Sequence, residues 1–204
     1  MKNQLERVLS AIDNINQQDS NVTVFNNEKH PKELIYGQRM TTCLMQYWPK
    51  ANELLQIAVR AQHIKRWHLK RSEFAPGKAG YYQWRIALGK FHGELAASLM
   101  VEQGYSELEA KQVASIICKE NLRDKDDTQL NADSQTLEDV ACLVFLTYYF
   151  DEFATNYIQQ DNEAKIIRIV KLTWGKMSEE AHKIALQLTL PDHLAGIVKK
   201  ALSA

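Results

Sequence analysis

Three strongly apolar segments of this 204-residue sequence each carry side chains suited to acid–base or ligand chemistry. The first is residues 54–67, LLQIAVRAQHIKRW, where His63 and Arg66 interrupt a run typical of a buried helix. Burying a polar side chain costs free energy unless the group is paired or functional. His63 and Arg66 are therefore the first candidates for a functional site.

The second segment contains His92, and its spacing predicts a long helix over residues 81–103. Arg85, Leu88, His92 and Leu99 fall on one stripe of that helix. Because this stripe is mostly apolar, His92 is predicted to point inward, on the same side of the helix as Arg85.

The third segment is a helix expected over residues 136–153, with Glu138 and Asp139 at its start. Imidazole and carboxylate groups on separate helices are ligands that a divalent metal such as Mn, Fe, Zn, Ni or Mg can bind. The candidate ligands are His63, His92 and Asp139, with Glu138 as the alternative carboxylate.

An ordinary structural explanation is open at each of these positions. An inward histidine is often a hydrogen-bonded core residue. Thr136 to Asp139 also match a capping box, and negative charge is favoured at a helix N-terminus. Each of these side chains could therefore be a ligand or a structural group.

The remaining pattern predicts an all-α fold, with about eight to ten amphipathic or buried helices. Residues 22–25 could form a short extended piece, but no partner strand is expected for it. Polar loops are expected over residues 68–80 and 121–135. The other helices are expected over residues 5–15, 31–47, 49–68, 106–121, 166–176 and 179–188, with a last one whose first turn contains Pro191.

Composition limits the classes of partner and compartment. A hydrophobic content of 45% can fill one core, so we expect a single compact domain over residues 1–204. Lys and Arg total 25 and Asp and Glu total 25, which argues against attraction of the whole surface to nucleic acid or membranes. No apolar leader or spanning run is evident, so a cytoplasmic protein is expected. Cys43, Cys118 and Cys142 are expected to be buried small residues rather than ligands.

The segment around His63 resembles the His-Asp segment of the HD superfamily, which are helical metal-dependent phosphohydrolases. His63 matches the histidine, and Ile64 stands where the family has its aspartate. The resemblance implies an HD-like helical core in which His92 and Asp139 are further metal ligands. It also places Lys119 roughly where many members have another histidine.

A second resemblance covers nearly the whole chain. YGQRM, AQHIKRW, GYYQWR, a following FH, LEDVACLVFL and TWGKMS occur in the order found in an uncharacterised domain-of-unknown-function family (serial number 4202). No established activity comes with that family. Its motif positions are rich in cations, which could form a pocket that binds phosphate or carboxylate oxygens. The residues concerned are Arg39, Arg66, Arg85 and Lys176, with Lys78 on the neighbouring loop.

Two alternatives apply to this cationic set. The arginines could instead form structural ion pairs with Glu33, Glu94 or Glu138. Tyr81, with Trp67 and Trp84, could stack on a base or sugar of a ligand or could simply pack in the core.

Two functional hypotheses follow. The first is an HD-like phosphohydrolase that acts on a small phosphorylated or nucleotide-like molecule. In it a metal is held by His63, His92 and Asp139, protons are handled by Glu138, and phosphate charge is neutralised by Arg66, Arg85 and Lys176. The second is a non-catalytic module that binds a phosphate-bearing anion, with Lys119 substituting for metal charge. Nucleic-acid binding is a weaker third reading, because the net charge is zero.

Overall fold

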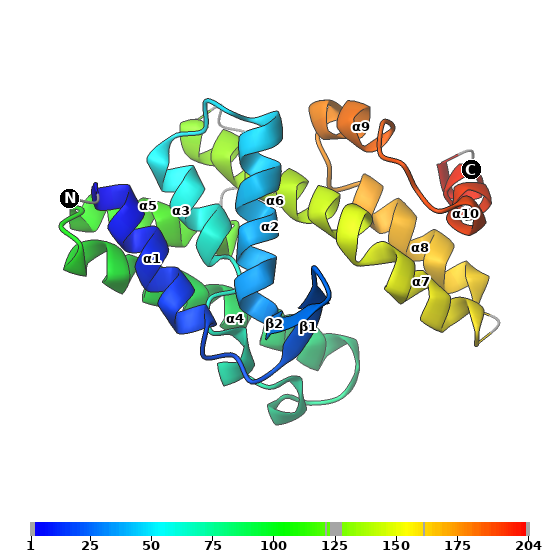
Figure 1. Cartoon of the computed structure of the whole chain (residues 1–204), viewed down its shortest axis with the longest axis horizontal. Coiled ribbons are helices and arrows are strands. Elements are labelled where there is room, and N and C mark those ends of the chain that lie inside the picture. The colour runs from blue at the N-terminus through cyan, green and yellow to red at the C-terminus, as the bar shows by residue number, and fades with distance from the viewer. Residues whose placement is uncertain (1–2, 121, 123–127, 161, 203–204) are drawn as a thin grey trace. The chain divides into compact units, whose positions relative to one another are not determined.

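The computed structural model of the chain describes residues 3–120, 122, 128–160 and 162–202. Ten α-helices account for most of these residues, and one hairpin contains both strands described (Figure 1). The predicted all-α class is therefore confirmed. Contacts divide the chain into unit 1, residues 1–137, and unit 2, residues 138–204. The expectation of a single domain stays a prediction.

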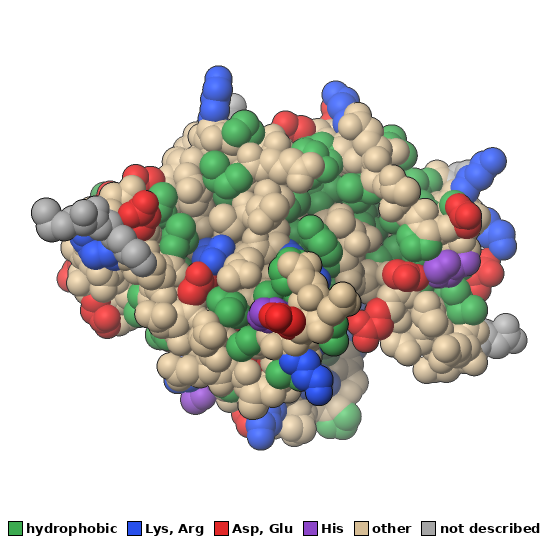
Figure 2. Space-filling model, in the orientation of Figure 1, with side chains coloured by type: hydrophobic (Ala, Val, Ile, Leu, Met, Phe, Trp, Pro, Cys, Tyr) green, Lys and Arg blue, Asp and Glu red, His purple; other side chains and the backbone are tan. Residues whose placement is uncertain are grey.

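Acidic and basic side chains are interspersed on the face drawn in Figure 2, as the balanced composition suggests. In the part of the chain that the structure describes, no helix combines the length and the apolar character needed to cross a membrane.

Unit 1 is built around the short helix α3, which packs against α1, α2, α4 and α5. Ile57, Ala58 and Val59 of this helix are fully buried, which makes α3 the centre of the core. The elements of unit 1 are α1 (Gln4–Asn16), β1 (Val22–Phe25), β2 (Glu28–Pro31), α2 (Lys32–Tyr47), α3 (Glu53–Ala61), α4 (Gly77–Glu102), α5 (Glu107–Cys118) and the first part of α6 (Gln129–Tyr148).

Helix α3 is shorter than the predicted helix over residues 49–68. The side chain of Asn52 accepts a hydrogen bond from the backbone N–H of Leu55, so Asn52 caps a helix that begins at Glu53 and not at Pro49. After Ala61 the chain turns, and Lys65 adopts the left-handed conformation with φ of 51°. His63 therefore lies in a turn, and a short 3-10 helix follows at Arg66–His68.

The extended piece at residues 22–25 does have a partner strand, so that expectation was wrong. Strand β1 pairs antiparallel with β2, with Val22 opposite Pro31 and Phe25 opposite Glu28. Asn26 and Asn27 form the turn with φ of 50° and 64°, a conformation that asparagine tolerates better than most residues. The sequence of β2, EKHP, lacks the alternation of apolar and polar residues that predicts a strand.

Glycines permit two close approaches around α4. A Cβ at Gly80 would lie 1.8 Å from the carbonyl oxygen of Ala75, so only glycine lets the preceding loop fold back on this helix. A Cβ at Gly93 would lie 3.1 Å from the carbonyl oxygen of Ala114, where α4 packs on α5. The end of α4 at Gly104, with φ of 93°, agrees with the predicted C-terminal glycine.

Unit 2 has its own apolar core, in which α8 packs against α7 and α10. Its elements are the second part of α6, α7 (Phe150–Ile158), α8 (Glu163–Trp174), α9 (Glu179–Ala185) and α10 (Asp192–Leu202). The buried core residues are Phe150, Ala154, Ile166, Val170, Leu194, Ile197 and Ala201.

Helix α6 begins at Gln129 rather than at the predicted Thr136. The hydroxyl of Thr136 donates to the carbonyl oxygen of Ala132 inside the helix, so Thr136 does not cap it. Residues 121 and 123–127 of the predicted polar loop lie outside the described residues, and residues 129–135 belong to α6 instead of a loop.

Candidate functional site

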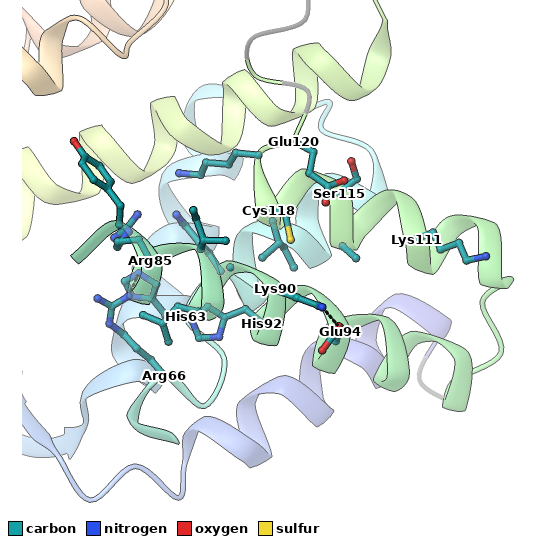
Figure 3. A pocket seen from close by; sticks show the side chains of 18 residues that line it. His63, Arg66, Arg85, Lys90, His92, Glu94, Lys111, Ser115, Cys118 and Glu120 are labelled. Atoms are coloured by element: carbon teal, nitrogen blue, oxygen red, sulfur yellow. Dashed lines mark hydrogen bonds and ion pairs between the residues drawn. The ribbon is translucent and has the colours of Figure 1, made fainter. Parts of the chain in front are cut away.

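A cavity of about 790 Å³ lies in unit 1, between α4, α5 and the turn that follows α3 (Figure 3). Its lining contains more positive than negative side chains. Apolar groups such as Leu88 and Ile117 complete its walls. The cations of the lining are Arg66, Arg85, Lys90, Lys111 and Lys119, against the carboxylates of Glu94 and Glu120.

His63 lies at one end of this pocket, with partners on both ring nitrogens. Its Nε2 is 3.0 Å from a terminal nitrogen of Arg66, and its Nδ1 is 3.1 Å from the carboxylate of Glu33. A guanidinium can only donate, so Nε2 accepts and the ring proton is on Nδ1, which donates to Glu33. Burial, with the charges of Arg66 and Arg85, holds the pKa of His63 well below its ordinary value, so the ring is neutral.

Arg66 is held in a fixed position by three neighbours, which are His63, Trp84 and Glu33. Its guanidinium carbon lies 5.1 Å from the ring centre of Trp84, and its Nε lies 4.0 Å from Glu33. The alternative that an arginine pairs with Glu33 is therefore realised here. Burial raises the pKa of Glu33 to about 7, although Arg66 and Lys32 act to lower it. Glu33 therefore ionises less readily than an ordinary carboxyl group and neutralises Arg66 less completely.

Arg85 lines the same pocket from α4 but lacks such partners. Among the described residues it makes neither a hydrogen bond nor an ion pair. Figure 3 shows Arg85 close to His63 and Arg66 at one end of the pocket. After burial, its positive charge is one of the causes that lower the pKa of Arg66. Two guanidinium groups therefore face the same space and repel each other.

His92 is the most deeply buried polar group of the lining, with 3% of its surface exposed. Its ring centre lies 6.2 Å from that of His63. Neither ring nitrogen makes a hydrogen bond of good geometry with a described residue. Burial, followed by the neighbouring His63 and Arg66, lowers the pKa of His92 to about 3, while a weak hydrogen bond to the backbone of Ile64 opposes the shift. The imidazole is therefore neutral.

Binding of a metal by His63 would require a rearrangement of its neighbour Arg66. Arg66 occupies the Nε2 side of the ring, so ligation through that nitrogen would require Arg66 to move away. Within the described ranges, no group of three or more His, Cys, Asp or Glu side chains could hold a metal ion. A metal at His63, His92 and Asp139 stays a prediction.

Asp139, Glu138 and Lys176 belong to unit 2. The carboxylate of Asp139 accepts hydrogen bonds from the backbone N–H of Ser178 at 2.8 Å and from its hydroxyl at 2.6 Å. Ser178 caps α9, so Asp139 supports the start of α9 rather than that of α6. Lys176 lies 3.3 Å from the carboxylate of Glu138, an ion pair with a lysine where the alternative above named the arginines.

Three further predicted residues do not line the pocket. The guanidinium carbon of Arg39 lies 5.7 Å from the ring centre of Phe25. The ammonium of Lys78 lies 5.8 Å from the ring centre of Tyr82. Tyr81 is 44% exposed and its ring approaches that of Trp84 at 6.0 Å. Of the predicted site residues, the pocket therefore brings together His63, Arg66, Arg85, His92 and Lys119.

Several residues at the site were not predicted from the sequence, among them Lys90, Lys111, Tyr82 and Tyr36. Tyr82 lines the pocket, and its spacing of three from Arg85 on a helix was a usable signal. The ring of Tyr36 stacks on the ring of His63, with ring centres 4.0 Å apart. No local pattern pairs Tyr36 with His63, because α2 and the turn after α3 meet only in the folded chain.

Comparison with known proteins identifies the family. The model described as Domain of unknown function (DUF4202) matches residues 6–198. The chain belongs to this family. No curated protein and no solved structure matches the DUF4202 chain. The expected relationship to the HD superfamily stays a prediction.

Proposed function

We propose that this DUF4202 chain binds a small phosphate-bearing anion in the pocket of unit 1, and that Arg66 and Arg85 hold the anion without a metal. The observation that carries the proposal is the environment of Arg85. This guanidinium lies close to that of Arg66 at one end of the pocket and has no acidic partner among the described residues. An anion placed between them would relieve the repulsion and supply the missing hydrogen-bond acceptors.

The surroundings of Arg66 suit it to this role. Trp84, His63 and Glu33 hold its guanidinium in place, so little side-chain entropy is lost when an anion binds. Because burial raises the pKa of Glu33 and so disfavours its charged form, positive charge on Arg66 remains available to a ligand. Lys119, with its backbone in the left-handed conformation at the end of α5, adds a further positive charge to the lining.

A thermal-shift experiment tests this proposal. Inorganic phosphate added in the presence of EDTA should raise Tm relative to chloride at equal ionic strength, because a ligand that binds only the folded state stabilises it. At a ligand concentration about 100 times Kd the expected stabilisation is about 2.7 kcal/mol. Identical melting curves in phosphate and chloride would refute the proposal.

A metal-dependent phosphohydrolase is the second candidate, favoured by the two unpartnered ring nitrogens of His92, which are potential ligand atoms. In that case Arg66 would have to leave Nε2 of His63 for the two imidazoles to share a metal. Repeating the thermal shift with manganese instead of EDTA separates the candidates. A phosphate effect that requires manganese, with release of phosphate from a phosphate ester, would favour the phosphohydrolase.

A further inference from the structure

The pocket has a second polar point besides its cationic end. His92 is 97% buried on the wall of the cavity, yet both of its ring nitrogens lack hydrogen-bond partners of good geometry among the described residues. Buried polar atoms in proteins nearly always have a partner, and one that does not calls for an explanation. A group supplied by the ligand is one explanation that the position of His92 allows.

The neutral state of His92 defines the chemistry of that group. A neutral imidazole offers one N–H donor and one acceptor nitrogen. A phosphate or carboxylate oxygen could satisfy only the donor, and the acceptor nitrogen would remain without a hydrogen-bond donor. Hydroxyl groups both donate and accept, so a chain of hydroxyls matches either ring nitrogen.

The spacing between the two polar points sets the size of the ligand. The ring centres of His92 and His63 are 6.2 Å apart, and a terminal nitrogen of Arg66 lies 3.0 Å from Nε2 of His63. One small molecule can therefore span from the guanidinium groups to His92. The cavity of about 790 Å³ is large enough for more than a bare phosphate ion.

Building on the proposed function, we infer that the ligand is a hydroxylated phosphate ester, a polyol or sugar phosphate, whose phosphate is bound by Arg66 and Arg85 and whose hydroxyl groups hydrogen-bond to His92. His92 is then the group that distinguishes such a molecule from inorganic phosphate and from an alkyl phosphate.

Calorimetric titrations with matched probes test the inference. Propyl phosphate has the phosphate and carbon chain of glycerol 3-phosphate but no hydroxyls, and ribose 5-phosphate provides a longer hydroxylated chain. The wild-type protein should bind at least one hydroxylated probe about tenfold more tightly than propyl phosphate, which corresponds to one good hydrogen bond. His92→Leu should erase this difference.

Two additional measurements test the inference even if His92→Leu does not fold. His92→Asn keeps one donor and one acceptor and should retain part of the preference for hydroxylated probes. In the intact wild-type protein labelled with ¹⁵N-histidine, a hydroxylated probe should shift the His92 ring nitrogens more than propyl phosphate does.

The outcomes separate this inference from the proposed function. Equal affinity for propyl phosphate and both hydroxylated probes, with phosphate binding intact, overturns the inference alone. A hydroxyl preference that persists in His92→Leu overturns it as well. If none of the phosphate probes binds the wild-type protein, the proposed function fails and the inference fails with it.

Discussion

Arg66 and Arg85 bring like charges to one pocket, but their surroundings differ. Arg66 is stacked on Trp84 and bonded to His63, while Arg85 makes neither a hydrogen bond nor an ion pair within the described part of the chain. Arg66 is thus a positioned cation, and Arg85 is an exposed cation with no acidic partner among the described residues. This difference makes Arg85 the more informative residue to change.

His92 should produce a measurable dependence of stability on pH. In the folded chain its pKa is lowered to about 3, whereas the unfolded chain takes up a proton at the ordinary value of 6.5. The unfolded state therefore binds more protons between these values, and stability falls as pH drops through this window. The slope that His92 contributes should be about 1.4 kcal/mol per pH unit.

Chemical denaturation of the wild type and His92→Asn between pH 4.5 and 6.5 checks this prediction. The variant should lose less stability on acidification. Glu33 contributes the opposite slope in both proteins, because its raised pKa of about 7 lets the folded chain hold the extra proton as pH rises above 4.5. Parallel curves for the two proteins would mean that His92 is not shielded from protonation.

At the scale of elements, the packing of α4 on α5 depends on small residues. Gly93→Ala should destabilise the fold by about 1–3 kcal/mol, because its Cβ would lie 3.1 Å from the carbonyl oxygen and 3.2 Å from the Cα of Ala114, which are backbone atoms. Gly89→Ala, one turn earlier, is the matched control. Its Cβ would meet only the Cα of Cys118 at 3.8 Å.

The control should therefore gain about 0.5–1 kcal/mol from the better helix propensity of alanine. Urea denaturation of both variants measures the two changes. Equal effects of the two substitutions would show that the helices do not approach each other most closely at Gly93.

Elements were predictable from the sequence where local signals set them. Ser106 with Glu109, Ser178 and Gly104 marked helix ends correctly. The helix around His63 was predicted too long, because apolar periodicity does not reveal that Lys65 takes a left-handed conformation. Local signals therefore established the all-α class but not every helix boundary.

The candidate site was predictable only in part. His63, Arg66, Arg85 and His92 were singled out as polar groups in apolar segments, and they do share a pocket. The partner of Nδ1 of His63 could not be foreseen, because Glu33 comes from α2, thirty residues away in sequence. Sequence spacing identifies which polar groups are unusual, but only the folded chain determines what each one faces.

On the scale of the whole molecule, positive charge is local rather than global. The chain has no formal net charge, so attraction of an anion depends on the pocket itself. Surface charges farther away than about 8 Å are largely screened at physiological salt. Substitutions remote from the pocket should therefore leave anion affinity unchanged.

Asp139→Asn, at a residue that does not line the pocket, tests this locality. It should lower stability by about 1–3 kcal/mol, because the amide cannot accept both hydrogen bonds from Ser178. Phosphate affinity should remain at the wild-type level. Ser178→Ala, which removes the same cap, should behave alike in both measurements. Loss of phosphate binding in Asp139→Asn with unchanged stability would instead support the predicted role of Asp139 as a metal ligand.

The most direct test of metal-free anion binding is titration calorimetry of inorganic phosphate in EDTA on three proteins. These are the wild type, Arg85→Gln, and Arg168→Gln, which makes the same change at an exposed arginine of α8 in unit 2. We predict binding to the wild type, a loss of about tenfold or more in Arg85→Gln, and wild-type affinity in Arg168→Gln. Equal affinities of Arg85→Gln and the wild type, or no binding to the wild type, would contradict the account.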